Sequence, residues 1–479
     1  MLVRFCYLLA IPLLSALAAV AQPPDTPRVA SAGAPILQLR HLWHAMADED
    51  GRFDVDLGPS AAVSVENAQF NHAEAAVATV AKGDASVRLY DAVTGEELWV
   101  SDGGAETECL AFTADDRYLV TGGEHQPELK IWDAGTGALV REIDDNVSIE
   151  GMVFSPDFSL LACGNDAGEV RVYDTSDPDP RNWPADPVYS VAQGPDRDAG
   201  TGTNHSDVNQ VDWTDDGRRF FVASRDGRVR LWALPDADAD TVRLEREYLG
   251  HTGSIKTVAL SADETLVASA SNWRTGTGTP RPTPARILVH DVATGATVLE
   301  YVIPDGKVPE VVRFSPDGAV LIAGTSFENA PETESATYVW RLADVRAGTV
   351  PPPQAITWYE QEYFDFSDDG SRLLIAASDG SVRMYATVID ATSGLWEASV
   401  PEIALQLAPN PARDHVTVTW PGSGAGDVLL TDAAGRVIAD ERDLRSPARL
   451  ALGTLAAGVY HVVVETGAAR GAGVLHVGQ

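Results

Sequence analysis

A pattern of short apolar strands and polar turns recurs along most of the chain, and it restricts the possible folds more than any other feature. The copy at 149–174 reads IEGMVFSPDFSLLACGNDAGEVRVYD, which is three strands joined by two turns. Seven copies occur, and their first strands end at Phe70, Phe112, Phe154, Trp213, Leu260, Phe314 and Phe366. Their third strands end at Tyr90, Trp132, Tyr173, Trp232, His290, Trp340 and Tyr385.

Each copy predicts a four-stranded antiparallel sheet, because the gap before the next copy holds one more strand, such as ALVREID at 138–144. A sheet of this kind has apolar residues on both faces and cannot bury them alone. Repeats at this spacing bury both faces by stacking in a ring. We therefore expect an all-β chain built on a seven-bladed β-propeller. A helical solenoid is excluded because no repeat contains an amphipathic helical stretch.

Three segments resemble the WD-repeat family of propellers, and the resemblance spans about 63–390. They are LKIWD at 129–133, SRDGRVRLW at 224–232 and GHTGSIKTVALS at 250–261. The resemblance implies hydrogen bonds within a blade among His, Ser or Thr, Asp and Trp. In the fourth repeat the candidates for this structural tetrad are His205, Ser224, Asp226 and Trp232. We expect them to stabilise the blade rather than to catalyse a reaction.

Two segments are candidates for the strand that completes the last blade of the ring. The resemblance implies an amino-terminal strand, for which ILQLRHLWH at 36–44 is the candidate. GLWEASV at 394–400 offers a local alternative. We therefore place the propeller at 36–400 and a linker at 22–35.

The region 401–479 contains short strands separated by Gly-rich turns, which predicts a small immunoglobulin-like β-sandwich. Three segments, LAPNPARDHVTV, LLTDAAGRVI and LAAGVYHVVVETG, closely resemble the C-terminal sorting domain of type IX secretion. The motif residues are Pro409, Asn410, Pro411, Asp432, Gly435, Arg436, Gly458 and Tyr460. The resemblance implies contact with the type IX machinery, passage across the outer membrane of a Bacteroidota-like bacterium, and removal of the domain afterwards.

The first 21 residues read as a signal peptide, with a charged start at Arg4, an apolar stretch and a cleavage site between Ala21 and Gln22. No later window is apolar enough to span a bilayer. Export leaves Cys109 and Cys163 in a compartment that permits a disulfide. Cys163 lies in LLACGND, where a small buried residue is expected, so we favour two separate core thiols.

The formal net charge is −35, and only four residues are lysines. Such a surface repels nucleic acid and anionic lipid, so we expect neither as a partner. Adaptation to high salt and a GC-rich genome that favours Arg over Lys both account for this composition. Almost all the negative charge precedes Glu402, because only 8 acidic and 6 basic residues follow from there on.

The sequence carries no strong signature of a metal site, a nucleophile or a bound cofactor, and we expect none of them. Asp236, Asp238, Asp240 and Glu247 fit the spacing of a calcium loop, but Thr241 replaces the required glycine. We interpret this segment as an acidic turn. YDAVTGEELW at 90–99 resembles a motif of quinone-dependent propeller dehydrogenases, but it occurs in full only once, so we interpret it as a hairpin.

Three long insertions lie in blades four to six, and strand order predicts that they project from one face of the ring. They cover 193–207, 272–286 and 326–335. The candidate binding residues in them are Trp273, Arg274, Arg281, Arg286, Glu328, Glu332, Glu334, Asp196, Arg197 and Asp198. Neutral growth of surface loops would produce the same insertions.

These observations favour a monomeric, exported, non-enzymatic propeller that binds a protein or a glycan at the cell surface. The alternative is an extracellular propeller enzyme, either a hydrolase or a quinoprotein-like oxidoreductase, with its site at the central channel. An enzyme of this kind should present inward-facing carboxylates, histidines or a metal at the channel mouth.

Overall fold

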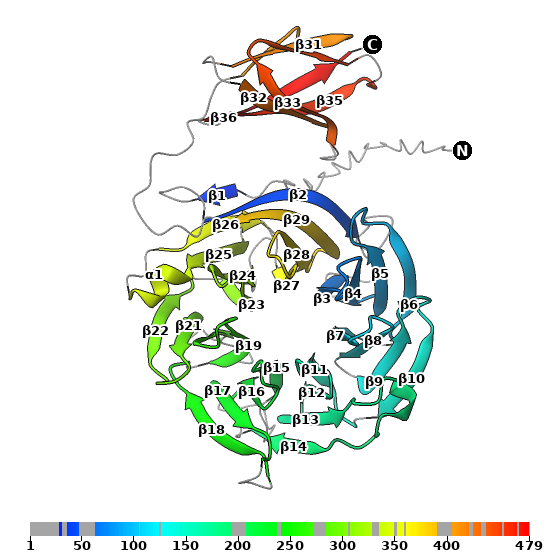
Figure 1. Cartoon of the computed structure of the whole chain (residues 1–479), viewed down its shortest axis with the longest axis vertical. Helices are drawn as coiled ribbons and strands as arrows, with labels where there is room; N and C mark the ends of the chain where they lie inside the picture. Colours follow the sequence, from blue (N-terminus) through cyan, green and yellow to red (C-terminus); the bar gives the residue numbers. More distant parts are fainter. Residues whose placement is uncertain are drawn as a thin grey trace, which may run out of the picture.

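The computed structural model is almost entirely β-structure, which confirms the predicted fold class. It describes residues 28–30, 36–46, 63–104, 106–123, 126–144, 146–193, 207–236, 241–251, 253–272, 284–304, 307–327, 335–348, 352–358, 361–389, 405–420, 425–432, 437–452, 455–466 and 469–478. Within these ranges, seven antiparallel sheets follow one another around a ring (Figure 1). Each first strand packs against the first strand of the next sheet, and β27 of the last sheet packs against β3 of the first. The ring is therefore closed.

The first four sheets are each contiguous in sequence. Blade one contains β3 (Ser64–Phe70), β4 (Ala76–Lys82), β5 (Ser86–Asp91) and β6 (Glu97–Asp102). Blade two contains β7 (Thr107–Phe112), β8 (Tyr118–Gly123), β9 (Gln126–Asp133) and β10 (Leu139–Asp144). Blade three contains β11 (Ile149–Phe154), β12 (Leu160–Asn165), β13 (Glu169–Asp174), the turn of 3-10 helix η1 (Pro180–Asn182) and β14 (Tyr189–Ala192). Blade four contains β15 (Val208–Trp213), β16 (Arg219–Ser224), β17 (Arg228–Ala233) and β18 (Arg243–Tyr248).

Blade five is also contiguous in sequence, with β19 (Ser254–Leu260), β20 (Leu266–Asn272), β21 (Arg286–Asp291) and β22 (Thr297–Val302). Blades six and seven, in contrast, each include a strand from the amino-terminal region. Blade six contains β23 (Lys307–Phe314), β24 (Val320–Phe327), β25 (Ser335–Arg341), the short helix α1 (Leu342–Arg346) and β26 (Gln354–Trp358), to which β1 (Arg28–Ala30) is added. Blade seven contains β27 (Gln361–Phe366), β28 (Arg372–Ala377) and β29 (Ser381–Ile389), completed by β2 (Leu37–Met46).

The pairing of β2 with β29 decides between the two candidate closing segments in favour of 36–44. Gln354 fixes the start of β2, because its Oε1 accepts a hydrogen bond from Leu37 N at 2.9 Å and its Nε2 donates to Leu37 O at 2.8 Å. The competing segment 394–400 lies outside the described residues. The segment 22–35, predicted as a linker, contains β1, whose three residues pair with β26.

The repeated Ser/Thr-x-Asp turns have one structural role. In six blades the hydroxyl donates to the Asp carboxylate two residues later, at 2.6 to 2.9 Å, as Ser155 does to Asp157. The next residue is left-handed in all seven blades, with φ between 51° and 68°. Gly217, Gly318 and Gly370 take this position in three blades because glycine has no Cβ to clash there. The turn therefore connects each first strand to its second strand in the same way.

Apolar side chains from neighbouring blades form the core of the ring. One cluster joins Val80 and Leu89 of blade one to Leu110 and Phe112 of blade two, and Leu110 is fully buried. Each sheet has two apolar faces, and the blades before and after it cover them, as the repeat predicts.

The carboxy-terminal region forms two further sheets around one core. The first sheet contains β30 (Gln406–Ala408), β31 (His415–Thr419) and β34 (Ala448–Ala451). The second contains β33 (Val437–Arg445), β32 (Ala425–Asp432), β35 (Gly458–Thr466) and β36 (Ala469–Val477). Val418 and Leu450 of the first sheet share a buried cluster with Leu430 and Val462 of the second, which is the arrangement of a β-sandwich.

Candidate functional site at the mouth of the central channel

The first strand of every blade contains a β-bulge close to its start. The pairing register skips one residue in each strand, as it does between Val65 and Asn67 in β3. A bulge redirects a side chain away from the regular alternation. The skipped residues are Glu66, Glu108, Glu150, Asn209, Lys256, Glu310 and Glu362, hereafter the bulge ring.

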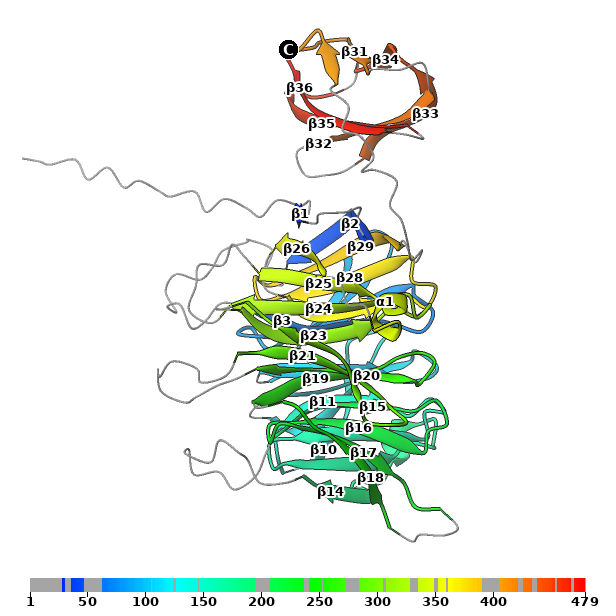
Figure 2. The same ribbon diagram turned by 90° about the vertical axis from the view of Figure 1, so that its left-hand side faces the viewer.

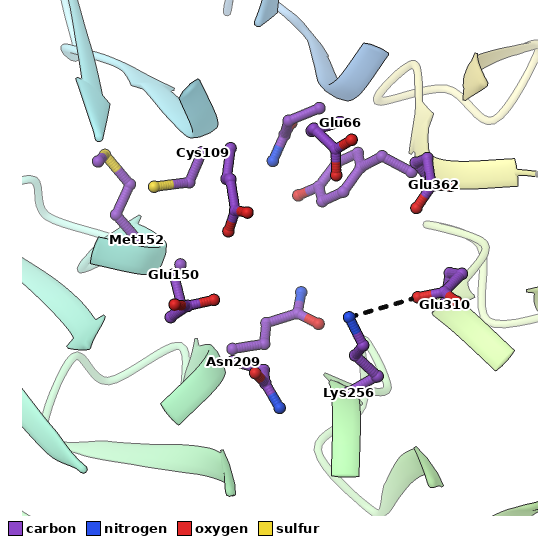
Figure 3. A pocket seen from close by; sticks show the side chains of 13 residues that line it. Glu66, Cys109, Glu150, Met152, Asn209, Lys256, Glu310 and Glu362 are labelled. Atoms are coloured by element: carbon purple, nitrogen blue, oxygen red, sulfur yellow. Dashed lines mark ion pairs between the residues drawn. The ribbon is translucent and has the colours of Figure 1, made fainter. Parts of the chain in front are cut away.

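All seven members of the bulge ring line one cavity of about 110 Å³ (Figure 3). The remaining wall comes from neighbouring residues of the same strands, among them Cys109, Met152 and Tyr363. Five of the seven members are glutamates, so the channel mouth is strongly acidic. Inward-facing carboxylates are thus present where the enzyme alternative requires them.

Two of the four lysines of the chain form ion pairs with the bulge ring. Lys82, at the end of β4, pairs with Glu108, and its Nζ lies 3.9 Å from Glu66 Oε2. Lys256 Nζ lies 3.6 Å from Glu310 Oε2. Glu310 Oε1 also accepts a hydrogen bond of 2.6 Å from Ser326 Oγ. Each lysine therefore holds a positive charge among carboxylates that would otherwise repel one another.

Burial dominates the protonation of Glu66. The pKa of Glu66 is raised to about 7, mainly by burial and also by the neighbouring Glu108, although the Lys82 ammonium lowers it. The Glu310 carboxylate raises the pKa of Lys256 above its ordinary value. The channel mouth therefore takes up a proton near neutral pH while Lys256 stays charged.

A second polar layer lies three residues further along the first strands. Burial raises the pKa of Asp212 to about 6 and that of Asp365 to about 7. The Asp212 carboxylate accepts a hydrogen bond of 2.8 Å from the backbone amide of Leu260 in the next blade. The Asp365 carboxylate accepts one of 2.8 Å from the backbone amide of Phe70. Arg313 lies 4.4 Å from the centre of the Tyr363 ring and favours the charged form of both aspartates. This layer connects blades around the channel.

The bulge ring lies at the rim where the three insertions join the blades. Ser254 pairs with Asn272, and Lys307 pairs with Phe327, so first strands begin where second strands end. Figure 2 shows β19, β20 and β23 running between the two rims of the ring. Because Ser326 donates a hydrogen bond to Glu310, the end of β24, where the blade-six insertion begins, is in direct contact with the channel mouth.

The structure describes only one of the ten candidate binding residues of the insertions. Arg286 begins β21, and its Nη1 donates to Glu300 Oε1 at 2.8 Å. The others, which are Trp273, Arg274, Arg281, Glu328, Glu332, Glu334, Asp196, Arg197 and Asp198, lie outside the described residues.

The tetrad residues of blade four have other partners in addition to one another. Asp226 N donates to Ser224 Oγ at 3.4 Å, and the Asp226 carboxylate forms a buried ion pair with Arg230. Trp232 Nε1 donates to Gln193 Oε1 at 3.4 Å. His205 lies outside the described residues. A bond of the type that the WD-repeat resemblance implies occurs in blade two, where Trp132 Nε1 donates to Thr121 Oγ1 at 2.9 Å.

The acidic segment after β17 makes ion pairs with arginines. Glu247 Oε1 accepts from Arg228 Nη1 at 2.9 Å and from Arg230 Nε at 3.1 Å, and Asp236 pairs with Arg243. Asp238 and Asp240 lie outside the described residues. No group of three or more His, Cys, Asp or Glu side chains in the described ranges is arranged to hold a metal ion. Cys109 and Cys163 are two separate buried thiols that form no disulfide.

Several motif residues of the carboxy-terminal region join its first and last strands. Asn410 Oδ1 accepts a hydrogen bond from His476 N at 2.8 Å, and the flanking Pro409 and Pro411 each follow a cis peptide bond. Tyr460 pairs with Asp432 across β35 and β32, and its hydroxyl donates to Ala456 O at 2.9 Å. Gly458 begins β35. Gly435, Arg436, Ala21 and Gln22 lie outside the described residues.

The sequence interpretation missed the bulge ring, although a simple signal marks it. Every member lies four residues before the residue that ends its first strand, as Glu66 does before Phe70. An alignment of the seven repeats on their closing residues would have placed five glutamates, one lysine and one asparagine in a single column.

The fold and the site together define a β-propeller with a polar channel mouth, followed by a small β-sandwich. The profile of the WD domain, G-beta repeat, matches residues 199–233 and 243–275. The profile of the Secretion system C-terminal sorting domain matches residues 406–472. The chain thus contains WD repeats, arranged as a propeller, and a type IX sorting domain, which indicates secretion to the cell surface or the exterior in Bacteroidota-like bacteria.

Three named proteins illustrate what this chain is similar to. Serine-threonine kinase receptor-associated protein of Gallus gallus is 27% identical over 46% of this chain and 65% of its own length. Angio-associated migratory cell protein of Homo sapiens is 26% identical over 40% of this chain and 44% of its own length. Protein LST8 homolog of Drosophila melanogaster is 24% identical over 56% of this chain and 75% of its own length. The chain thus covers less than two thirds of the first two relatives.

In the described ranges, no helix is both long enough and apolar enough to span a membrane.

Proposed function

We propose that this protein is a secreted, non-enzymatic binding propeller, which holds a protein or glycan partner at the rim around the channel mouth. The contact surface is formed by the insertions of blades four to six, with Trp273 and Arg274 as its central residues. The observation that carries the proposal is the contact between Ser326 and Glu310 at 2.6 Å, which joins the start of the blade-six insertion to the bulge ring. A rigid ring that brings long connections together at one rim is a common scaffold for binding.

The relatives support a binding role by analogy. The protein of Gallus gallus is named for its association with a receptor. Because fold alone does not determine function, this support extends to the general role and not to the partner.

The test is retention of a partner from the native cell envelope. The propeller is immobilised, captured proteins and glycans are identified, and the identified partner is purified and bound again. We expect Trp273→Ala/Arg274→Ala to reduce this affinity at least tenfold. The control is Val93→Ala/Arg117→Ala, which changes two exposed side chains in turns at the other rim. Equal affinity of the two double variants would reject the proposed contact surface.

A second candidate function is hydrolysis at the channel mouth. It is favoured by one observation: the carboxylates of Glu66 and Glu108 both lie beside the Lys82 ammonium, and the pKa of Glu66 is raised to about 7. A carboxyl group that is protonated near neutral pH beside a second carboxyl group suits general acid catalysis. A panel of glycoside and ester substrates decides between the candidates. Turnover that Glu66→Gln abolishes supports the hydrolase, and no turnover by the wild-type protein rejects it.

A further inference from the structure

Blade five contains two histidines that are almost completely buried. His251, just before β19, is 3% exposed, and His290 in β21 is 1% exposed. They are the two histidines that are buried in the described part of the chain. His290 takes the position at which the third strands of the other six blades have Tyr or Trp. Blade five therefore replaces an aromatic residue that does not titrate near neutral pH by histidine, whose unperturbed pKa lies close to neutral pH.

Each of these histidines has one hydrogen bond and one unsatisfied ring nitrogen. His251 Nε2 bonds with Ser269 Oγ at 2.8 Å, and His290 Nε2 donates to Leu249 O at 2.9 Å. The Nδ1 atoms of both rings have no partner in the described part of the chain. Protonation would thus add a positive charge and a donor without an acceptor inside the blade.

Among the residues that the structure describes, none places a compensating negative charge beside the two rings. Tyr248 of β18 packs against His290, with ring centres 5.6 Å apart, and β20 contributes the neutral Ser269. The charged Arg286 of β21 is paired with Glu300 of β22, and Asp291 accepts hydrogen bonds within its own turn. Burial lowers the pKa of His251 to about 3, with His290 and Arg286 adding to the shift, and burial also lowers the pKa of His290.

We infer that His251 and His290 make blade five an acid-sensitive element of the ring, which opens locally when the surroundings become mildly acidic while the other blades stay closed. In the open blade both imidazoles reach water and accept a proton, whereas in the closed blade they stay neutral. Acidification therefore shifts the equilibrium towards the open blade.

The sign and size of the effect follow from linkage. A histidine whose pKa is lower in the closed state stabilises that state above its ordinary pKa of about 6.5, and this stabilisation is lost as the pH falls. A histidine that stays neutral in the closed blade adds about a tenfold increase in the open population between pH 7.5 and pH 5.5. His251 therefore adds about tenfold, and His290, whose pKa is also lowered, adds a further increase of at most about tenfold.

The test is hydrogen exchange of the full chain, measured by mass spectrometry at pH 7.5 and 5.5 and corrected for the intrinsic rates. Peptides from 253–272 and 284–304 report on blade five, and peptides from 106–123 and 126–144 report on blade two, where Trp132 holds the position of His290. We expect protection to fall by more than about tenfold in blade five only. An equal fall in blade two, or no fall in blade five, overturns the inference.

Matched variants separate the two histidines. His290→Tyr introduces the residue of three other blades and should reduce the effect to about tenfold. His251→Gln/His290→Tyr should remove it, and a double variant that keeps the full effect contradicts the inference. If the variants do not fold at pH 7.5, as judged by circular dichroism, the comparison of blades five and two in the wild-type chain still decides.

Discussion

Asp365 of β27 accepts a hydrogen bond of 2.8 Å from the backbone amide of Phe70 in β3, and this bond connects the last blade to the first. The two residues are 295 positions apart in the sequence. Asp212 makes the same bond to Leu260 between blades four and five. A carboxylate at this depth of the channel therefore serves as a connection between adjacent blades.

Replacing Asp365 should change both the stability of the ring and its pH dependence. Asp365→Ala leaves the buried Phe70 amide without an acceptor, which we expect to cost about 1–3 kcal/mol of unfolding free energy. Asp365→Asn keeps an acceptor and should cost less. Because the pKa of Asp365 is raised to about 7, its contribution is present at acidic pH and is lost as the pH rises through 7.

Urea unfolding at pH 5.5 and 8.5 measures this prediction. The difference in stability between the wild type and Asp365→Asn should shift in favour of the variant at pH 8.5. Asp212→Asn is the matched control in blade four, and its pKa of about 6 should place the same shift at a lower pH. A difference that is the same at both pH values would contradict the assignment.

The amino-terminal strand should contribute to the stability of the whole ring. Leu37 of β2 is fully buried in a cluster with Val339 and Tyr385. We expect Leu37→Ala to cost about 2–5 kcal/mol, because it leaves a cavity between blades six and seven. Leu98→Ala on β6 is the control, since this leucine is 53% exposed and its loss should cost about 0.5 kcal/mol or less. Equal midpoints of chemical unfolding for the two variants would show that β2 does not hold the ring together.

The repeat predicted the ring because the spacing of strands and turns is a local property of the sequence. Phe154, the Ser155–Asp157 turn and Tyr173 mark the strand boundaries within one copy. The choice of closing strand could not be made in this way. Leu37 and Ile389 pair across 352 positions, and both candidate segments are apolar enough to fill the place.

The channel mouth was missed because a bulge has no signature within a single strand, and its members share a column only when the seven repeats are aligned. Glu108 lies between Thr107 and Cys109 in an otherwise apolar strand, and the alternation of strand residues predicts that such a glutamate faces solvent. Only the register shift, which is a relation between two strands, turns it into the cavity. The short strand β1 was missed for a similar reason, because its three residues carry no turn signal and pair with a distant edge.

The buried ion pair of blade four offers a direct test of the structural interpretation of Asp226. The side chains of Asp226 and Arg230 are 3% and 4% exposed. Asp226→Ala leaves the guanidinium with one fewer partner inside the blade, so we expect a loss of about 3–5 kcal/mol. Asp236→Ala breaks the more exposed pair with Arg243 and should cost about 1 kcal/mol or less. Thermal unfolding of both variants measures this difference, and similar melting temperatures would argue against a structural role for Asp226.

Salt should separate the two explanations of the acidic composition. The formal net charge of −35 lies almost entirely before Glu402, so the propeller repels itself at low ionic strength. If the protein is adapted to high salt, the ring should unfold when NaCl is lowered from 2 M to about 0.05 M, where screening is weak. If the composition reflects only the genome, the melting temperature should change by only a few degrees. Differential scanning fluorimetry across this range decides, with glycerol as a control for effects unrelated to charge.

Asn410 connects the start of the sorting domain to its last strand, and this connection should matter for export. Asn410 Oδ1 accepts a hydrogen bond of 2.8 Å from His476 N. Beside it, Ala412 N donates a backbone hydrogen bond of 2.7 Å to His476 O. Asn410→Ala removes one of these bonds and should lower the stability of the domain by about 1 kcal/mol. We expect a smaller secreted fraction in a host with the type IX machinery, whereas Asn410→Asp keeps the acceptor and should be secreted normally. Asp414→Ala, an exposed change in the same segment, is the control. Secretion of Asn410→Ala at the wild-type level, together with unchanged resistance of the domain to proteolysis, would show that the motif asparagine acts in another way.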